Sequence, residues 1–299
     1  MPTAHDRRVT ARGLSFHYVE SGPPQWGSPQ WGTPTAPPLL CLHGITQTAH
    51  SWDEVAADLS SAYRVMCFDQ RGHGDSDWAP DGDYSRQTQA ADLDAITDAL
   101  GLTRFILAGM SMGGINAITF TARHPEKVQA LIIVDVSPEI QVKGVENIRH
   151  FIQAVDELDS FEAFVERAHE FNPRRSLDNI RSRLSHNLKQ LPNGKWTWKY
   201  DKALRSPERG FHASALLNLW DDVRAIHCPT LIIKGSESDI LSAESAGKLQ
   251  AAIPGSRGAV VPGAGHSVMG DNPAAFVDAV RQFLTNIHHP QNSHTAPCQ

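Results

Sequence analysis

The chain has few cysteines, no excess of basic residues and no long apolar run. Its four cysteines are spread over 299 residues without the spacing of a metal site, which favours reduced thiols over a disulfide scaffold. Acidic residues outnumber basic ones, 33 to 27, which disfavours a nucleic-acid partner. No apolar run is long enough to span a bilayer, and no apolar segment of the signal-peptide type follows the N-terminus. We therefore expect a cytoplasmic protein that acts on small molecules, without a membrane partner.

Strand-like and helix-like segments alternate over residues 39–136 and 230–287, after a hairpin near the N-terminus. The run at 128–136 is apolar throughout, as expected for a central parallel strand that is buried on both faces. This order predicts an α/β protein with a mostly parallel central sheet and helices on both faces.

The alternation stops between residues 138 and 222, where the pattern is helical only. We interpret this block as a helical cap over the carboxyl ends of the strands, inserted into a core domain formed by residues 1–137 and 223–287. Residues 288–299 are expected to be a disordered tail, and the Gln-Trp-Gly repeat at 25–34 a surface loop.

The segment from Gly109 to Gly113 joins a predicted strand at 105–108 to a predicted helix at 115–124. Glycines on both sides of Ser111 suit a sharp strand-to-helix turn, in which a side chain at either position would collide with the backbone. Such a turn lifts Oγ of Ser111 above the sheet. It also directs the amide of Met112 toward a point where negative charge can develop.

A second glycine turn, His43-Gly44-Ile45-Thr46, follows the strand at 39–42. The amide of Ile45 is therefore a candidate second oxyanion donor, and His43 a candidate substrate contact; an ordinary turn with a structural His43 is the alternative. The later turn from Asp69 to Ser76 carries Asp, Arg and His, which we interpret as groups that brace the loop rather than as catalytic groups.

A serine nucleophile needs a histidine base, which in turn needs an acid to orient it. His266 lies in a glycine-rich loop after the predicted strand at 259–261. For the acid we choose Asp239, in the loop after the strand at 230–234. Glu237 in the same loop and Asp135 at the end of the preceding strand remain alternatives.

The cap is acidic over residues 138–173 and basic over 174–209. Two solvated faces that attract one another would explain this split, and a site for a substrate carboxylate would explain it as well. Candidates for that site are Arg174, Arg175, Arg181 and Arg183. Aromatic side chains could wall an apolar pocket or fill the interior of the cap; they are Trp196, Trp198, Phe211 and Trp220.

Together these residues resemble the α/β-hydrolase fold family over nearly the whole chain. The resemblance rests on His43-Gly44, the turn at 69–76, the motif around Ser111, and an acid followed by His266. It implies Ser111 as nucleophile, His266 as general base, Asp239 as its orienting acid, and the amides of Ile45 and Met112 as the oxyanion hole. Ser rather than Asp at 111 disfavours the dehalogenase and epoxide hydrolase branches.

The function implied is hydrolysis of a small-molecule carboxylic ester, with no metal and no cofactor. The basic second half of the cap favours a substrate that carries a carboxylate. Lactonase activity and cleavage of carbon–carbon bonds with the same triad are the alternatives among enzymes. A small-molecule receptor with slow turnover is the alternative outside them.

Overall fold

The computed structural model describes residues 4–22, 36–206, 216 and 218–288. Eight strands form the main sheet in the order β1-β2-β4-β3-β5-β6-β10-β11. Strand β2 pairs antiparallel with both β1 and β4, and every other pair of neighbouring strands is parallel. In chain order the strands are β1 (Ala4–Ala11), β2 (Leu14–Ser21), β3 (Pro38–Leu42), β4 (Arg64–Phe68), β5 (Phe105–Met110), β6 (Val128–Val134), β10 (Thr230–Gly235) and β11 (Arg257–Val261).

Helices cover both faces of this sheet, as alternating side chains along the strands require. In β5, for example, Phe105 and Leu107 belong to one buried cluster, whereas Ile106 and Ala108 belong to the other. The first cluster is completed by α2 (Arg86–Ala99), α3 (Met112–Arg123), α7 (Leu219–Arg224) and α8 (Ala243–Ala252). The second is completed by η1 (Ala49–Trp52), α1 (Asp53–Leu59), α9 (Val268–Asp271) and α10 (Pro273–His288). The predicted fold class is confirmed.

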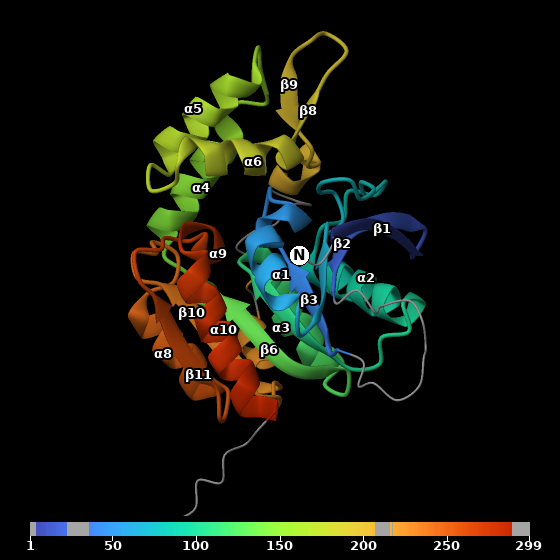
Figure 1. Cartoon of the computed structure of the whole chain (residues 1–299), viewed down its shortest axis with the longest axis vertical. Helices are drawn as coiled ribbons and strands as arrows, with labels where there is room; N and C mark the ends of the chain where they lie inside the picture. Colours follow the sequence, from blue (N-terminus) through green and yellow to red (C-terminus); the bar gives the residue numbers. More distant parts are fainter. Residues whose placement is uncertain (1–3, 23–35, 207–215, 217, 289–299) are drawn as a thin grey trace, which may run out of the picture.

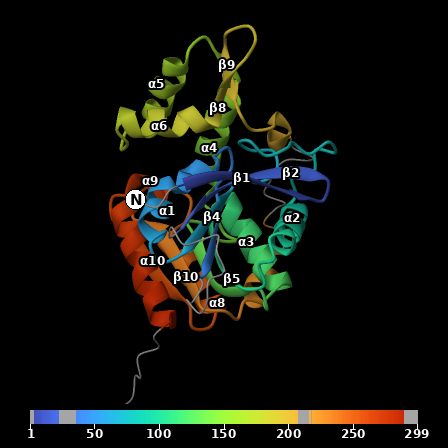
Figure 2. The same cartoon turned by 45° about the vertical axis from the view of Figure 1, so that its right-hand side comes forward.

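The described elements between β6 and α7 gather at the carboxyl edge of the sheet. Figures 1 and 2 both show α4, α5 and α6 grouped with β8 and β9 at one end of the molecule, away from α8. The bounds here are α4 (Val142–Ala154), β7 (Glu157–Leu158), α5 (Phe161–Phe171), α6 (Leu177–Asn187), β8 (Leu188–Gln190), β9 (Trp196–Trp198) and η2 (Lys202–Arg205). We call these elements the cap.

The expectation of an all-helical cap was wrong, because β7, β9 and β8 form a three-stranded antiparallel sheet. Its signal was present in the sequence: Asn193-Gly194 is a turn pair, and Gly194 has a φ of +82°. The helix expected at 210–222 also differs. Its described part is α7, which packs against α3 in the core, while residues 207–215 and 217 lie outside the described residues.

Among the described residues, no helix is both long and apolar enough to cross a membrane. The repeat at 25–34 and the tail from residue 289 onward lie outside the described part of the chain, so those two predictions stay predictions.

Candidate active site

Ser111 occupies a strained turn between β5 and α3, as its flanking glycines predict. Its φ of +53° is in a region that serine rarely adopts, and such strain is often found where a side chain must be held for function. A Cβ at Gly109 would lie 2.3 Å from the carbonyl oxygen of Gly113, and a Cβ at Gly113 would lie 2.4 Å from that of Leu42. Glycine is therefore required at both positions for α3 to start directly after the strand.

Ser111, His266 and Asp135 form a continuous hydrogen-bonded chain. The Oγ of Ser111 lies 3.0 Å from Nε2 of His266, and Nδ1 of His266 lies 2.8 Å from Oδ2 of Asp135. Asp135 is completely buried and follows β6, the strand next to β5. Its carboxylate also accepts hydrogen bonds from the amide of Gly235, at 3.0 Å, and from the hydroxyl of Ser238. These donors fix the carboxylate so that a second lone pair of Oδ2 faces His266.

Asp239, chosen from the sequence as the acid, does not contact His266. Its side chain is exposed and accepts a hydrogen bond of 3.1 Å from Asn147 in the cap. Glu237 is exposed as well and forms an ion pair with Arg174 at 2.7 Å. The physical reason for the correction is strand order: β6 and β10 end side by side, and the loop after β11 folds His266 onto the end of β6. Asp135, weighed as an alternative, is the carboxylate in contact.

The loop after β3 lies against Ser111, and this close approach requires glycine at position 44. A Cβ on Gly44 would lie 2.6 Å from Sδ of Met110 and 3.4 Å from Cβ of Ser111. Within this loop the Gly44 amide donates to Oε1 of Gln47, and the Thr46 amide donates to Nε2 of His73. Among the described residues, the amides of Ile45 and Met112 donate to no protein acceptor.

His43 is not a substrate contact, because it is completely buried and both of its ring nitrogens are engaged. Its Nε2 accepts from the amide of Gln70 at 3.0 Å, and Nδ1–H donates to the carbonyl of Gly44 at 2.7 Å. Burial lowers the pKa of His43. Burial also lowers the pKa of His73, to about 3. Both rings are therefore neutral supports of the loop at neutral pH.

The turn at 69–76 braces the same region, as its composition suggested. Buried Asp69 accepts hydrogen bonds from His17, from the amide of Ala49 at 2.7 Å and from the amide of Asp75 at 2.9 Å. Burial alone would raise the pKa of Asp69, but these donors and His43 lower it. Arg71 is paired with Asp92 inside the core. These charged groups hold loops and do not face Ser111.

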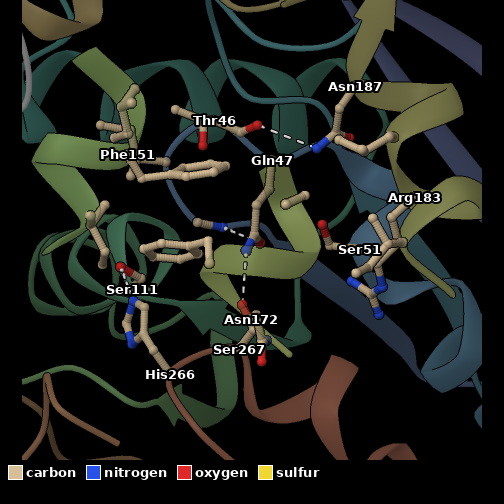
Figure 3. A pocket seen from close by; sticks show the side chains of 18 of the residues that line it. Thr46, Gln47, Ser51, Ser111, Phe151, Asn172, Arg183, Asn187, His266 and Ser267 are labelled. Atoms are coloured by element: carbon tan, nitrogen blue, oxygen red, sulfur yellow. Dashed lines mark hydrogen bonds between the residues drawn. The ribbon is translucent and has the colours of Figure 1, made fainter. Parts of the chain in front are cut away.

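A mostly apolar pocket of about 170 Å³ adjoins Ser111 between core and cap. Trp198 lines it, as predicted, and Phe151 and Phe171 are wall residues that no sequence pattern indicated. Trp220 does not line it, because α7 packs this side chain against the core. Phe211 lies outside the described residues. Figure 3 shows Ser111 and His266 at one side of the pocket, with Arg183 and Ser51 at the other.

The candidate arginines occupy different surroundings. Arg175 lines the pocket and is neutralised by buried Asp271, with Nε 2.7 Å from Oδ1. Arg174 lies in a neighbouring hollow, paired with Glu237, and exposed Arg181 is paired with Glu162. Arg183 lines the pocket, and its buried Nε has no hydrogen-bond partner among the described residues. Burial, followed by the like charge of Arg175, lowers the pKa of Arg183 to about 10, so it stays charged at neutral pH.

Comparison with known proteins agrees with this geometry. A family model described as the alpha/beta hydrolase fold matches residues 37–273. The esterase Rv0045c of Mycobacterium tuberculosis is 32% identical over 257 residues, covering 84% of this chain and 83% of the relative. Its crystal structure, at 30% identity, has a TM-score of 0.75 over 95% of this chain and 92% of that chain.

Two further relatives differ in their named substrates. The 2-(acetamidomethylene)succinate hydrolase of Mesorhizobium japonicum is 27% identical over 254 residues, covering 84% of this chain and 88% of the relative. A solved structure of an E-2-(acetamidomethylene)succinate hydrolase has a TM-score of 0.83 at 25% identity, over 95% of this chain and all of that chain. The sn-1-specific diacylglycerol lipase ABHD11 of Mus musculus is 28% identical over 262 residues, covering 84% of this chain and 81% of the relative.

Proposed function

Since this chain belongs to the alpha/beta hydrolase fold family, we propose that it is a serine hydrolase that cleaves carboxylic esters of small molecules. The observation that carries the proposal is the hydrogen-bonded chain from Ser111 through His266 to Asp135, at 3.0 and 2.8 Å, which opens onto a mostly apolar pocket. Such a chain activates a hydroxyl that is otherwise a poor nucleophile.

In the proposed reaction, Oγ of Ser111 attacks the ester carbonyl while Nε2 of His266 takes its proton. Asp135 holds Nδ1–H of His266 and stabilises the imidazolium that forms. The amides of Ile45 and Met112, which have no protein acceptor among the described residues, would donate to the oxyanion. One such donor is worth about 3 kcal/mol of barrier in a serine hydrolase.

The tetrahedral intermediate then collapses, and His266 gives its proton to the leaving alkoxide. The acyl group remains on Ser111 as an ester. A water molecule loses its proton to His266 and attacks this ester, after which the acid leaves and Ser111 regains its proton. All proton transfers in this cycle pass through Nε2 of His266.

For the substrate we propose an ester that also carries a carboxylate. Arg183 lies across the pocket from Ser111, and its buried Nε lacks a partner among the described residues (Figure 3). A buried cation beside the pocket favours an anionic ligand there, because the charge of the ligand would offset the cost of burying the guanidinium. One relative is named for a succinate, which is a dicarboxylate, and this supports the proposal.

Arg183→Gln tests the carboxylate, with Arg181→Gln as the matched control on the same helix. We expect Arg183→Gln to lower kcat/KM for a mono-p-nitrophenyl ester of a dicarboxylic acid by roughly 10- to 100-fold, the value of a hydrogen bond to a charged group. For the uncharged ester of equal chain length, Arg183→Gln should leave kcat/KM unchanged. Arg181→Gln should leave kcat/KM unchanged for both esters. An equal loss on both esters would contradict a carboxylate at Arg183.

The ester function itself is tested with p-nitrophenyl esters from acetate to laurate, using wild type and Ser111→Ala. We expect wild type to turn over and Ser111→Ala to lose roughly five to six powers of ten in kcat. Wild type that is folded but inactive on all esters would contradict the ester proposal and redirect the assay to lactones and carbon–carbon substrates. A single acylation without turnover would instead support a receptor.

A further inference from the structure

A column of three histidines stands at the contact between cap and core, outside the triad. The rings of His50 and His186 stack with centroids 3.5 Å apart and 20° between their planes, and His17 stacks beyond His50 with centroids at 6.5 Å. His50 belongs to η1 of the core, whereas His186 belongs to α6 of the cap. Two imidazoles from two separate parts of the fold thus meet face to face.

A carboxylate completes this group. Nδ1 of His50 lies 3.0 Å from Oδ2 of Asp53, and one ring nitrogen or carboxylate oxygen from each of His50, Asp53 and His186 lies within 4.8 Å of the others. Zinc binds imidazole nitrogen and carboxylate oxygen at about 2.0–2.2 Å, so two ligands on one ion are about 3.0–3.4 Å apart. The pair His50–Asp53 already has this spacing, and the ring nitrogen of His186, within 4.8 Å of both, would have to move closer on binding.

We propose that His50, Asp53 and His186 bind a divalent transition metal ion of the Zn²⁺ or Ni²⁺ type, which ties the cap to the core. Two imidazoles with one carboxylate suit this class of ion, whereas Ca²⁺ and Mg²⁺ prefer sites built from oxygen ligands only. The side chains of His50 and Asp53 are 19% and 49% exposed, so an ion can enter and water can fill the remaining coordination positions.

Other histidines nearby are less suited to a metal. His17 has one ring nitrogen on Asp69 at 2.8 Å and the other on Asp6 at 3.0 Å, so both are already used. His266 has both of its ring nitrogens in the triad. Among the described residues, by contrast, the ring of His186 forms no hydrogen bond, which leaves its nitrogens available.

The proposed site adjoins the pocket through the immediate neighbours of two ligands. Ser51 follows His50 and Asn187 follows His186, and both line the pocket. Asn187 accepts from the hydroxyl of Thr48 at 3.0 Å and donates to the carbonyl of Thr46 at 3.4 Å (Figure 3). A metal ion at the site would therefore fix the end of α6 against the loop that carries Ile45. We expect it to hold the cap against the core and to slow turnover.

Calorimetric titration of the untagged full chain with ZnCl₂ tests the binding directly. Wild type is compared with His186→Asn and Asp53→Asn, on two different elements, and with His227→Asn, an exposed histidine after α7, as the control. We expect the first two variants to lose one equivalent of Zn²⁺, or at least about 10-fold in affinity for it, and His227→Asn to match wild type. The other histidines, including those after residue 288, are common to all four proteins and cancel in the comparison.

Equal stoichiometry and affinity in wild type, His186→Asn and Asp53→Asn would overturn the proposal. Melting temperatures in chelator establish whether each variant folds. Because the two substitutions are on separate elements, a variant that fails to fold can be set aside and the other still tests the site. Cobalt absorption adds a second readout, since its visible bands should change when Asp53 no longer ligates.

The effect on turnover rests on the proposed hydrolase function, but the binding does not. Loss of esterase activity with zinc that persists unchanged in His186→Asn would assign the inhibition to the Ser111–His266 pair, and this would overturn the link between the cap site and turnover.

Discussion

The core and the cap are held together by different kinds of contact. In the core, neighbouring strands share backbone hydrogen bonds, and both faces of the sheet are covered by buried side chains. Many cap-to-core contacts are instead single polar side-chain pairs: Asn147–Asp239, Arg174–Glu237, Asn179–Glu54, Asn187–Thr48 and Lys199–Asp75. The exposed ion pairs among them, such as Arg174–Glu237, are worth about 0–1 kcal/mol each. Loss of one such pair should therefore cost little, whereas the continuous backbone ladder of β5 and β6 fixes the ends of the strands that precede Ser111 and Asp135.

The largest effect expected from this difference concerns the two candidate acids. Asp135→Asn removes a buried core carboxylate that orients His266, so we expect kcat to fall by roughly four powers of ten. Asp239→Asn removes only a partner of Asn147 in the cap and should change kcat by less than about threefold. Steady-state kinetics on one p-nitrophenyl ester compares them, and a larger loss in Asp239→Asn would reverse the correction made above.

One substitution at two places compares the packing of the two regions. Leu131 in β6 is fully buried, whereas Leu177 at the start of α6 is 41% exposed. We expect Leu131→Ala to lower the free energy of unfolding by about 2–5 kcal/mol and Leu177→Ala by less than about 1 kcal/mol. Urea unfolding followed by circular dichroism measures both. Comparable losses would mean that the cap contributes to global stability as much as the core does.

Acid should destabilise the core through its buried neutral histidines. His43 and His73 have lowered pKa values when folded, about 3 for His73, against about 6.5 when unfolded. The stability that these two histidines contribute is therefore fully present above pH 6.5. As the pH falls below this value, the free energy of unfolding decreases by at most about 1.4 kcal/mol per pH unit for each histidine.

The contribution of His17 to stability has the opposite pH dependence, because the pKa of His17 is raised in the folded protein. Burial lowers this pKa, but the hydrogen bonds to Asp69 and Asp6, together with the charges of Asp69 and Asp75, outweigh burial. Its contribution is complete below pH 6.5 and is lost only as the pH rises through the folded pKa, so it is constant in the acid range. Urea unfolding from pH 6.5 to 4.5 should thus show falling stability, with a shallower slope in His73→Asn. An unchanged slope in that variant would contradict a neutral buried His73.

Local sequence rules were enough to predict the parts of the site that depend on backbone conformation. The turn at Ser111 needs its two glycines, and His266 follows a strand in a glycine-rich loop, so both could be found from the chain alone. The choice between Asp135 and Asp239 could not be made this way, since each follows a parallel strand and both strands end at the same edge. Only the path of the loop after β11 decides between them.

The cap was harder to predict because its contacts depend on side-chain directions. Arg174, Arg175, Arg181 and Arg183 looked equivalent in the sequence, yet carboxylates neutralise the first three and the buried Nε of the fourth lacks a partner among the described residues. The tryptophans Trp198 and Trp220 also differ in their surroundings. Strand β9 directs Trp198 into the pocket, whereas α7 holds Trp220 against the core.

Labelling of Ser111 by a fluorophosphonate, followed by peptide mass spectrometry over time, tests the central claim most directly. We predict a single adduct on Ser111 that forms at similar rates in wild type and Asp239→Asn, and at least about 100-fold more slowly in Asp135→Asn. An adduct on another residue, or slow labelling of Asp239→Asn with normal labelling of Asp135→Asn, would contradict the Ser111–His266–Asp135 triad.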